Sequence, residues 1–534
     1  MNIKKILLNE KAFFCLIVLL NAIPVLSLKF FLTLDGPAHL YNGNIIKDLI
    51  VGNSPLINSL YEFNPVITPN WSGHFILAVL SLVFNGFITE KIFILLYLIF
   101  LPVSFRYLTN AISPSSRNLS YLIFPFSYAF LFECGFFNFC IAFIFMFFTL
   151  GYWYKNSEKP KIYHVIILCL LLTVTFFSHI LIYGFLGAVL LLLMIGSCIR
   201  DFKGLKVFAG CILEKSLILF IAALPSLILL IQFLISIKFE STYEKYPFDV
   251  LLKWIIKVRP LILFNFEKES LITIFFIFIY LSALLYTVII RVKSIASRQL
   301  HGGHFLFSLK QGIVVSDVIL LFSFFLLTLF FIIPNSASAG MMSDRLCVGF
   351  FIFLIIWLAI QPYRKWFSYI IIVSTLVLHF SILITHYPSY KGLSNIANEI
   401  YKTSEYVKDE SIVVSVNLTD NWMLGHSADY MGADKAIVLY NYEAFYKWFP
   451  LRWNKDNIPD LLIGDRQTIK SIWWYSNPNS AIKRKVDYVM LFGSTGLLYE
   501  PNMQELKYVL YENYNLIYKS SDSYILLFEL KNDS

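Results

Sequence analysis

Charged residues are scarce in this sequence. Only 14% of the 534 residues are charged, whereas 58% are hydrophobic and 18% are aromatic. A soluble domain carries about 25% charged residues, and no soluble core could hide this many Phe, Leu and Ile side chains. Lipid must therefore be the solvent for most of the chain, which predicts an α-helical polytopic membrane protein.

Several signatures of soluble enzymes are also missing. The sequence has no CxxC pair, no Gly-rich phosphate loop, no internal repeat and no low-complexity tract. No cysteine follows Cys347, so we expect no disulfide near the C-terminus, and nothing points to a metal site or a thiol nucleophile. The net charge of +9 comes from short Lys and Arg clusters between apolar runs, the positive-inside pattern of membrane topology. Nucleic acid is therefore not an expected partner.

Twelve apolar runs are long enough to be candidate spans. Four basic linkers, 155–161, 199–215, 291–316 and 362–366, are predicted to be cytoplasmic, and the first run is expected to be retained as a span. A cytoplasmic N-terminus and an external C-terminus require an odd number of crossings. We therefore expect 11–13 spans, with one run of the region 73–106 re-entrant or one span missed. The twelve runs are 12–33, 73–89, 91–106, 119–134, 137–154, 162–179, 181–198, 216–237, 271–290, 317–334, 348–361 and 367–386.

The composition changes after His386, where Tyr, Asn, Asp and Lys become common and short alternating runs replace the long apolar blocks. Residues 1–386 are predicted to form the transmembrane domain, with an amphipathic helix in a first external loop at 34–72. Residues 387–534 are predicted to form a small extracytoplasmic α/β domain. Its strands are expected at 411–416, 436–440, 486–492, 516–518 and 523–530, and its helices at 393–406 and 503–512.

The most informative stretch, 34–42, reads LDGPAHLYN and follows the first span. Pro37 suits the first turn of a helix, where its missing N–H has no partner to lose. His39 and Asn42 would then share one helix face, and the helix dipole would favour the Asp35 carboxylate. The alternative is an interfacial loop whose Asp35 merely caps the helix.

Other polar groups fall at the predicted outer ends of spans. They are Glu133 and Asn138 in an apparent hairpin, His179 at the end of a span, and Asp344 with Arg345 before another. Ionisable groups at the membrane are costly enough to be functional candidates. Each could instead be an interfacial anchor or part of an ion pair, with Asp344 neutralising Arg345. Together they predict one external polar cluster.

A polar and aromatic stretch near the C-terminus contains Trp422, His426, Asp429 and Tyr440, followed by residues 441–443. Aromatic rings stack on sugar faces, so this stretch could bind a glycan. A Tyr-rich surface loop is the favoured alternative, because exposed loops are generally polar.

These features resemble the GT-C glycosyltransferases, polytopic enzymes that use polyprenyl-phosphate sugars. The likeness lies in the acid after the first span, the long first external loop, the many spans and the external C-terminal domain. The DGPAHL run, the hairpin at 135–139, the Ser178-His179 pair and the Asp344-Arg345-Leu346 run are also similar to such proteins. The resemblance covers about residues 10–386 and is mainly architectural. Many members carry an acidic pair in this loop, whereas this sequence has one Asp followed by Gly36.

The resemblance implies a hexosyltransferase-type, inverting transfer from a lipid-linked sugar to an outer-face acceptor, which could be a glycan, a lipid or a protein. It implies Asp35 as general base, Arg345 as counter-charge for the departing phosphate, and His39 or His179 as an orienting group. The implied substrate-binding residues are Asn42, Glu133, Asn138, His179 and Asp344. No residue pattern requires a cofactor. Whether the reaction needs a divalent cation, Mg²⁺ or Mn²⁺, is left open. The expected location is the plasma membrane, in contact with membrane lipid, most simply a bacterial inner membrane.

Two other functions stay open. A transporter or flippase of lipid-linked glycans should show two similar halves and charged residues at mid-membrane depth. Here the polar residues lie at span ends and no duplicated halves are evident, which favours the enzyme. A catalytically inactive partner in envelope assembly is the second alternative.

Overall fold

The computed structural model describes most of the chain and is mainly helical. Its described residues divide into two compact units. The first unit comprises Met1–Ile23, Leu96–Glu133 and Asn138–Tyr387, and the second comprises Pro24–Leu95, Cys134–Phe137 and Pro388–Ser534. The described residues are 9–200, 202, 204–236, 244–300, 316–336, 340–440, 449–454, 459–460, 475–476 and 486–531.

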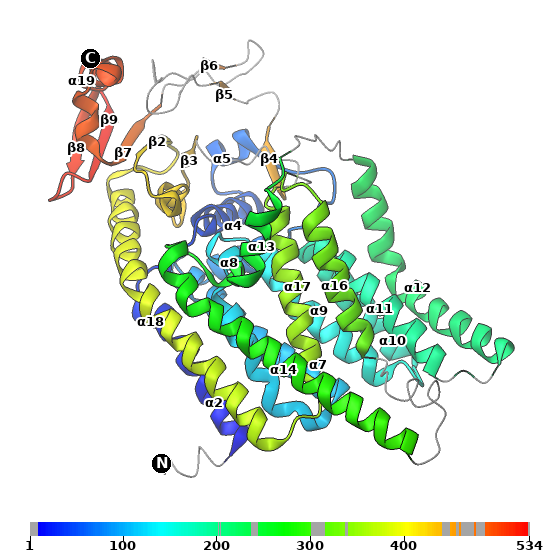
Figure 1. Cartoon of the computed structure of the whole chain (residues 1–534). Helices are drawn as coiled ribbons and strands as arrows, with labels where there is room; N and C mark the ends of the chain where they lie inside the picture. Colours follow the sequence, from blue (N-terminus) through cyan, green and yellow to red (C-terminus); the bar gives the residue numbers. More distant parts are fainter. Residues whose placement is uncertain are drawn as a thin grey trace. The chain divides into compact units, whose positions relative to one another are not determined.

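Seven helices in the described part of the chain are long and apolar enough to cross a membrane. They indicate a membrane-embedded, multi-pass protein, as the composition predicted. The seven are α7 (Gly86–Ile112), α9 (Phe137–Asn156), α11 (Ile180–Arg200), α12 (Leu205–Ser236), α14 (Phe266–Leu300), α17 (Met342–Ala359) and α18 (Lys365–Thr403) (Figure 1).

Exposed apolar side chains support the same conclusion. The apolar window of α12 is only 22% buried, and Leu217, Ile221 and Ile228 each expose more than half of their surface. A water-soluble protein rarely leaves so large an apolar surface uncovered. These faces of α12 therefore suit lipid tails as their solvent.

Three of the predicted spans take a different form. The run 73–89 forms α6 (Ser72–Ser81), whose 10 residues rise about 15 Å, half of the ~30 Å hydrocarbon core. The first run forms α2 (Glu10–Asn21) and α3 (Ile23–Ser27), which break at Ala22. The run 119–134 lies in a 3₁₀ helix, η1 (Pro114–Tyr128), followed by the short α8 (Phe130–Glu133).

Helix α17 is the core of the first unit, because every one of its residues is buried. It packs against η1, α14, α16 (Asp317–Ile332) and η2 (Arg259–Leu261), which follows the amphipathic α13 (Phe248–Ile256). Helices α10 (Ile162–Ser178), α11 and α12 contact one another, and α11 also contacts α16. A helix that is apolar all round is expected in such a buried position.

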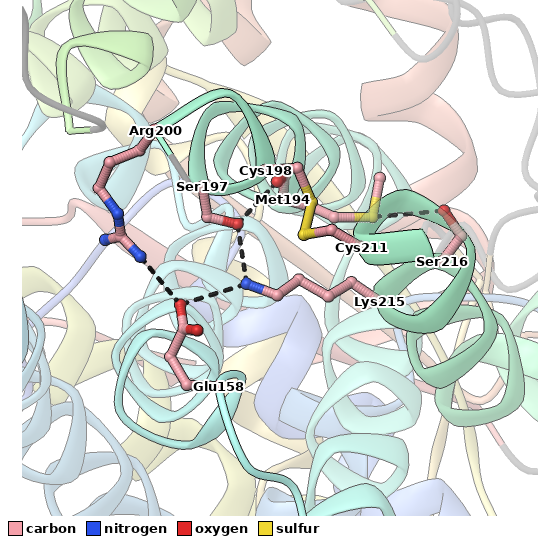
Figure 2. The surroundings of a disulfide bond; sticks show 8 residues. All are labelled: Glu158, Met194, Ser197, Cys198, Arg200, Cys211, Lys215 and Ser216. Atoms are coloured by element: carbon pink, nitrogen blue, oxygen red, sulfur yellow. Dashed lines mark hydrogen bonds and ion pairs between the residues drawn. A yellow bond between two sulfur atoms is a disulfide. The ribbon is translucent and has the colours of Figure 1, made fainter. Parts of the chain in front are cut away.

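A disulfide joins Cys198, near the end of α11, to Cys211 in the first turns of α12. Figure 2 shows an ion cluster beside it. Glu158 accepts hydrogen bonds from Arg200 and Lys215, each at 3.2 Å, and Lys215 also donates to Ser197 at 3.0 Å. The cluster and the disulfide both hold the ends of α11 and α12 together. Cysteine spacing in the sequence did not predict this bond.

The second unit contains a five-stranded mixed sheet of order β3-β2-β7-β9-β8. The β3–β2 and β2–β7 pairs are parallel, and the β7–β9 and β9–β8 pairs are antiparallel. Each strand overlaps a segment where the alternating pattern predicted one, as does α19 (Gln504–Asn513). The strands are β2 (Ile412–Leu418), β3 (Val438–Leu439), β7 (Tyr488–Gly493), β8 (Tyr514–Lys519) and β9 (Ile525–Leu530).

The loop 34–72 folds with the C-terminal residues in this unit. It contains α4 (Gly36–Val51), α5 (Pro55–Leu60) and β1 (Tyr61–Phe63), and β1 pairs with β4 (Leu451–Trp453). The buried Tyr41 hydroxyl donates to the Ile437 carbonyl at 2.8 Å and accepts from the Leu439 N–H at 3.0 Å. Asn44 also donates to the Gly432 carbonyl at 2.8 Å.

The remaining elements are short. The helix predicted at 393–406 is the continuation of α18, which runs through Pro388 without ending there. The other described elements are η3 (Ser404–Tyr406), η4 (Trp422–Leu424), η5 (Ser427–Gly432), β5 (Pro459–Asp460), β6 (Tyr475–Ser476), η6 (Thr495–Tyr499) and η7 (Pro501–Met503).

Candidate functional site

Asp35 occupies the N-cap position of α4, yet its carboxylate makes no capping hydrogen bond. Its backbone is in the helical region (φ −94°, ψ −4°), which is unlike the extended backbone of a usual N-cap. The Asp35 N–H donates to the Cys134 carbonyl at 3.2 Å, and Oδ1 lies 3.7 Å from Nε2 of His426. The alternative that Asp35 merely caps the helix is therefore not what the structure contains.

Two glycines pack tightly around Asp35. A Cβ added at Gly36 would collide with the Thr33 hydroxyl and lie 3.2 Å from the Phe137 ring. Gly135 has a φ of +77°, and a Cβ there would lie 2.6 Å from the Asp35 nitrogen. A side chain at the position after Asp35 would force Thr33 to shift, which disfavours a second acid there.

His39 lies in the first turn of α4 with both of its ring contacts inside the protein. Its Nδ1 is 3.2 Å from Nε2 of His74, on α6, and the ring also hydrogen-bonds the Gly135 backbone. Burial, and secondarily the charge of His426, lower the pKa of His39 to about 4. His39 is therefore neutral at physiological pH.

His426 lies directly before η5, with one carboxylate on either side of its ring. Its Nε2 faces Asp35 at 3.7 Å, and its Nδ1 faces Oδ2 of Asp429 at 3.8 Å. Asp429 is buried, whereas the His426 and Asp35 side chains keep 30% and 29% of their surface exposed. We call Asp35, His39, His74, His426 and Asp429 the Asp35 cluster.

Two more buried polar groups belong to the second unit. The Asn42 side chain is fully buried, and neither end of its amide has a hydrogen-bond partner among the described residues. Glu90, on α7, is also buried and accepts a hydrogen bond from the Tyr430 hydroxyl at 2.7 Å. An unpaired amide is costly to bury, so Asn42 has unused capacity to bind a polar partner.

The first unit contains a second polar group of residues, which we call the Arg345 cluster: His179, Arg259, Asp344 and Arg345. Asp344 and Arg345 lie in the first turn of α17 and are both buried. Asp344 forms an ion pair with Arg259 at 3.6 Å, while Arg345 lies 3.3 Å from Nε2 of His179. Adjacent residues on a helix point in different directions, so Asp344 and Arg345 each have a further partner, while the Arg345 charge still acts on Asp344 as the alternative expected.

The contact between Arg345 and His179 is frustrated. His179, between α10 and α11, accepts the Leu181 N–H on Nδ1 at 3.2 Å, which leaves the ring proton on Nε2. That N–H then faces Nη1 of Arg345, which can only donate. If the proton were on Nδ1 instead, that N–H would face the Leu181 N–H. One contact sets two donors face to face in either tautomer.

Glu133 and Asn138 are buried in the first unit, at the end of α8 and the start of α9. Glu133 is near enough to Tyr97, Tyr128 and Cys140 to act on them electrostatically. The Arg345 charge also acts on Cys140.

The structure thus brings Asp35 and His39 together in the second unit, beside Asn42 on the same helix. It brings His179, Asp344 and Arg345 together in the first, where Glu133 and Asn138 also lie. Of the proposed sugar-binding stretch, residues 441–443 lie outside the described residues. In the described part of the chain, no three His, Cys, Asp or Glu side chains are placed to hold a metal ion.

Three of these residues were not predicted as partners, and two, His426 and Asp429, were predicted in a different role. Arg259 lies between the predicted spans 216–237 and 271–290, and His74 lies within the predicted span 73–89. Glu90 lies between two apolar runs, and His426 lies in the polar and aromatic stretch for which a surface loop is the favoured prediction. No local pattern links them to their partners, since His426 is 391 residues from Asp35 in the chain. A lone polar residue in an apolar segment is the one signal that could have marked His74 and Glu90.

Comparison with known proteins adds no relative from which a role could be transferred. No protein-family model matches this sequence, and no curated protein matches it significantly.

Proposed function

We propose that the protein is a membrane glycosyltransferase that moves a sugar from a polyprenyl-phosphate-linked donor to an acceptor on the outer face of the membrane. The membrane-length helices support the first part, because they offer lipid-facing surfaces beside which a prenyl tail could lie. The resemblance to GT-C enzymes in the first loop supports the second part.

The observation that carries the proposal is the frustrated pair of Arg345 and His179. Two N–H donors face each other 3.3 Å apart at a buried helix end. A phosphate oxygen placed between them would accept from both and relieve the conflict. Arg345 would then stabilise the charge that develops as the lipid phosphate leaves.

Asp35 supplies the other half of the proposed chemistry. Its carboxylate is partly exposed and is not used as a helix cap. In the proposed step it takes the proton of an acceptor hydroxyl or amine, while that atom bonds the anomeric carbon. The bond from the anomeric carbon to the phosphate oxygen breaks, and the lipid phosphate keeps the electron pair. A single displacement of this kind inverts the anomeric centre.

The proposal also fixes a location. Asp35 and the C-terminal residues from 387 would face the extracytoplasmic side, in a plasma membrane of bacterial type. The basic linkers at 155–161, 199–215, 291–316 and 362–366 would face the cytoplasm. The proposed step needs no cofactor. Adding a chelator to the transfer assay tests whether a divalent cation is required.

The test is transfer of labelled sugar from defined polyprenyl-phosphate donors by the full-length protein in lipid nanodiscs. We expect Asp35→Asn and Arg345→Gln each to lower turnover by at least about 10²-fold. Asp249→Asn is the matched control, because Asp249 is exposed on α13, and it should leave turnover unchanged.

Two results would contradict the proposal. Unchanged turnover in Asp35→Asn would remove Asp35 as the base. Absence of transfer from every donor, combined with protein-dependent movement of the same lipids across a liposome membrane, would favour the flippase.

A further inference from the structure

We infer that His426, and not His39, is the histidine that positions the Asp35 carboxylate for its role as base. The inference rests on the proposed function, because it adds a positioning residue to the same reaction. It also makes the C-terminal segment part of the catalytic machinery.

His426 lies between two acidic residues. Its two ring nitrogens face two carboxylates, Asp35 at 3.7 Å and Asp429 at 3.8 Å. One imidazole ring can therefore contact both acids at once, with one nitrogen towards each. The ring holds the Asp35 carboxylate in place, and this carboxylate is the proposed proton acceptor.

The two acids differ in how far their side chains are exposed to solvent. The Asp429 side chain is only 4% exposed, whereas the Asp35 side chain is 29% exposed. The buried acid can hold the ring from inside, and the exposed acid can meet an acceptor. His426 would thus act through Asp35, in the way that an orienting group acts on a catalytic base.

His39 is held by other contacts and does not take this role. One of its ring nitrogens faces His74 at 3.2 Å and the ring also hydrogen-bonds the Gly135 backbone, so both of its polar contacts are internal. It also packs against the rings of Phe137 and Phe449. With its ring held in this way, His39 does not position the Asp35 carboxylate.

The turn η5 is firmly held. The Asp429 N–H donates to the His426 carbonyl at 3.0 Å, which fixes the two residues relative to each other. The Tyr430 hydroxyl bonds Glu90, and the Gly432 carbonyl accepts from Asn44. The His426 ring therefore extends from an anchored turn, as a positioning residue must.

The kinetic test uses the full-length protein in the transfer assay. We expect His426→Ala to lower kcat by about 10²-fold with the KM for the donor nearly unchanged, and added imidazole to restore part of kcat. His426→Gln should lower kcat in the same way, which guards against a folding defect in the alanine variant. His164→Ala is the matched control, since His164 lies on α10 outside both clusters, and it should show neither loss nor rescue.

A second test needs no turnover. Diethyl pyrocarbonate modifies unprotonated imidazoles, and peptide mass spectrometry identifies which histidines react. We expect His426 and the control His164 to react while His39 and His74 do not. Because each carboxylate faces one ring nitrogen of His426, Asp35→Asn and Asp429→Asn should each change the reaction rate of His426 roughly two- to five-fold at fixed pH.

Each outcome bears on one claim. If His39 reacts as fast as His426, or if neither Asn variant changes the rate at His426, the inference is overturned. A wild-type protein that transfers no sugar would overturn the proposed function alone, because the modification rates still decide how His426 and Asp35 interact.

Discussion

At the scale of single residues, Gly135 sets the position of Asp35. Its φ of +77° suits glycine, and a Cβ would lie 2.6 Å from the Asp35 nitrogen and 2.7 Å from the Gly36 nitrogen. We expect Gly135→Ala to destabilise the protein by about 1–3 kcal/mol through strain and overpacking, and to lower transfer. Thermal unfolding in detergent and the transfer assay measure these two effects.

Gly187→Ala is the control for this change. Gly187 lies inside α11, and a Cβ there meets no atom within 4 Å. Alanine is the better helix former by roughly 1 kcal/mol, so this variant should melt at the same temperature or higher. Equal melting of Gly135→Ala and the wild type would show that the hairpin does not fix Asp35.

His39 predicts a pH dependence of stability. Its pKa is about 4 in the folded protein, against 6.5 for an ordinary histidine. Below pH 6.5 the unfolded chain takes up a proton that folded His39 refuses, so stability should fall as the pH drops towards 4. His39→Asn should remove this contribution. The drop in unfolding temperature between pH 6.5 and pH 4 should then be smaller than in the wild type by roughly 2–6 °C. His164→Asn, whose residue lies outside the Asp35 cluster, should leave the wild-type slope unchanged.

The residues of the candidate site divide by whether a local pattern could reveal them. Asp35 and His39 are four positions apart at a helix start, so their proximity follows from helix geometry alone. His74, Arg259 and His426 reach their partners only through tertiary packing. The role of Gly36 also needed coordinates, because the clash with Thr33 is a contact between side chains and not a motif.

At the scale of elements, the Cys198–Cys211 bond tests the predicted topology. The linker 199–215 is basic and predicted to be cytoplasmic, where thiols stay reduced. We therefore expect both cysteines to be thiols in growing cells and to form the disulfide only on oxidation. We expect the Glu158, Arg200 and Lys215 cluster to hold the helix ends with or without the bond. Acid quenching of cells, alkylation and mass spectrometry measure the thiol content.

A matched variant separates the bond from the ion cluster. Cys198→Ser with Cys211→Ser should match the wild type under reducing conditions and lose at most about 3 kcal/mol of stability when the wild type is oxidised. A pair that is fully disulfide-bonded in quenched cells would place this linker in an oxidising compartment. The predicted orientation of the helices would then be reversed.

Elements were predictable where one physical signal dominates. Long apolar runs from residue 137 onward form helices near their predicted positions, because lipid leaves the backbone no other way to satisfy its hydrogen bonds. Helix α6 was predicted too long, since hydropathy alone does not mark its end at Ser81. The helix expected at 393–406 merged with α18, because Pro388 did not stop the helix as its missing N–H would suggest.

At the scale of the whole molecule, the chain is grouped differently from its linear order. The loop 34–72 and the residues from 388 share one compact unit, joined by the β1–β4 pair and by the bonds of Tyr41. Pairings across almost 400 residues cannot be read from local periodicity. The alternating pattern predicted the strands of this unit but could not predict which earlier segment would complete it.

The proposed reaction assigns Asp35 and Arg345 to the same displacement step. We expect the double variant Asp35→Asn with Arg345→Gln to lose less kcat/KM than the product of the two single losses, since residues that act on one displacement are not independent. As a control, Asp249→Asn combined with Arg345→Gln should equal Arg345→Gln alone. Fully multiplicative losses would mean that the two residues act in separate steps, and the single-displacement mechanism would fail while the helical membrane architecture stood.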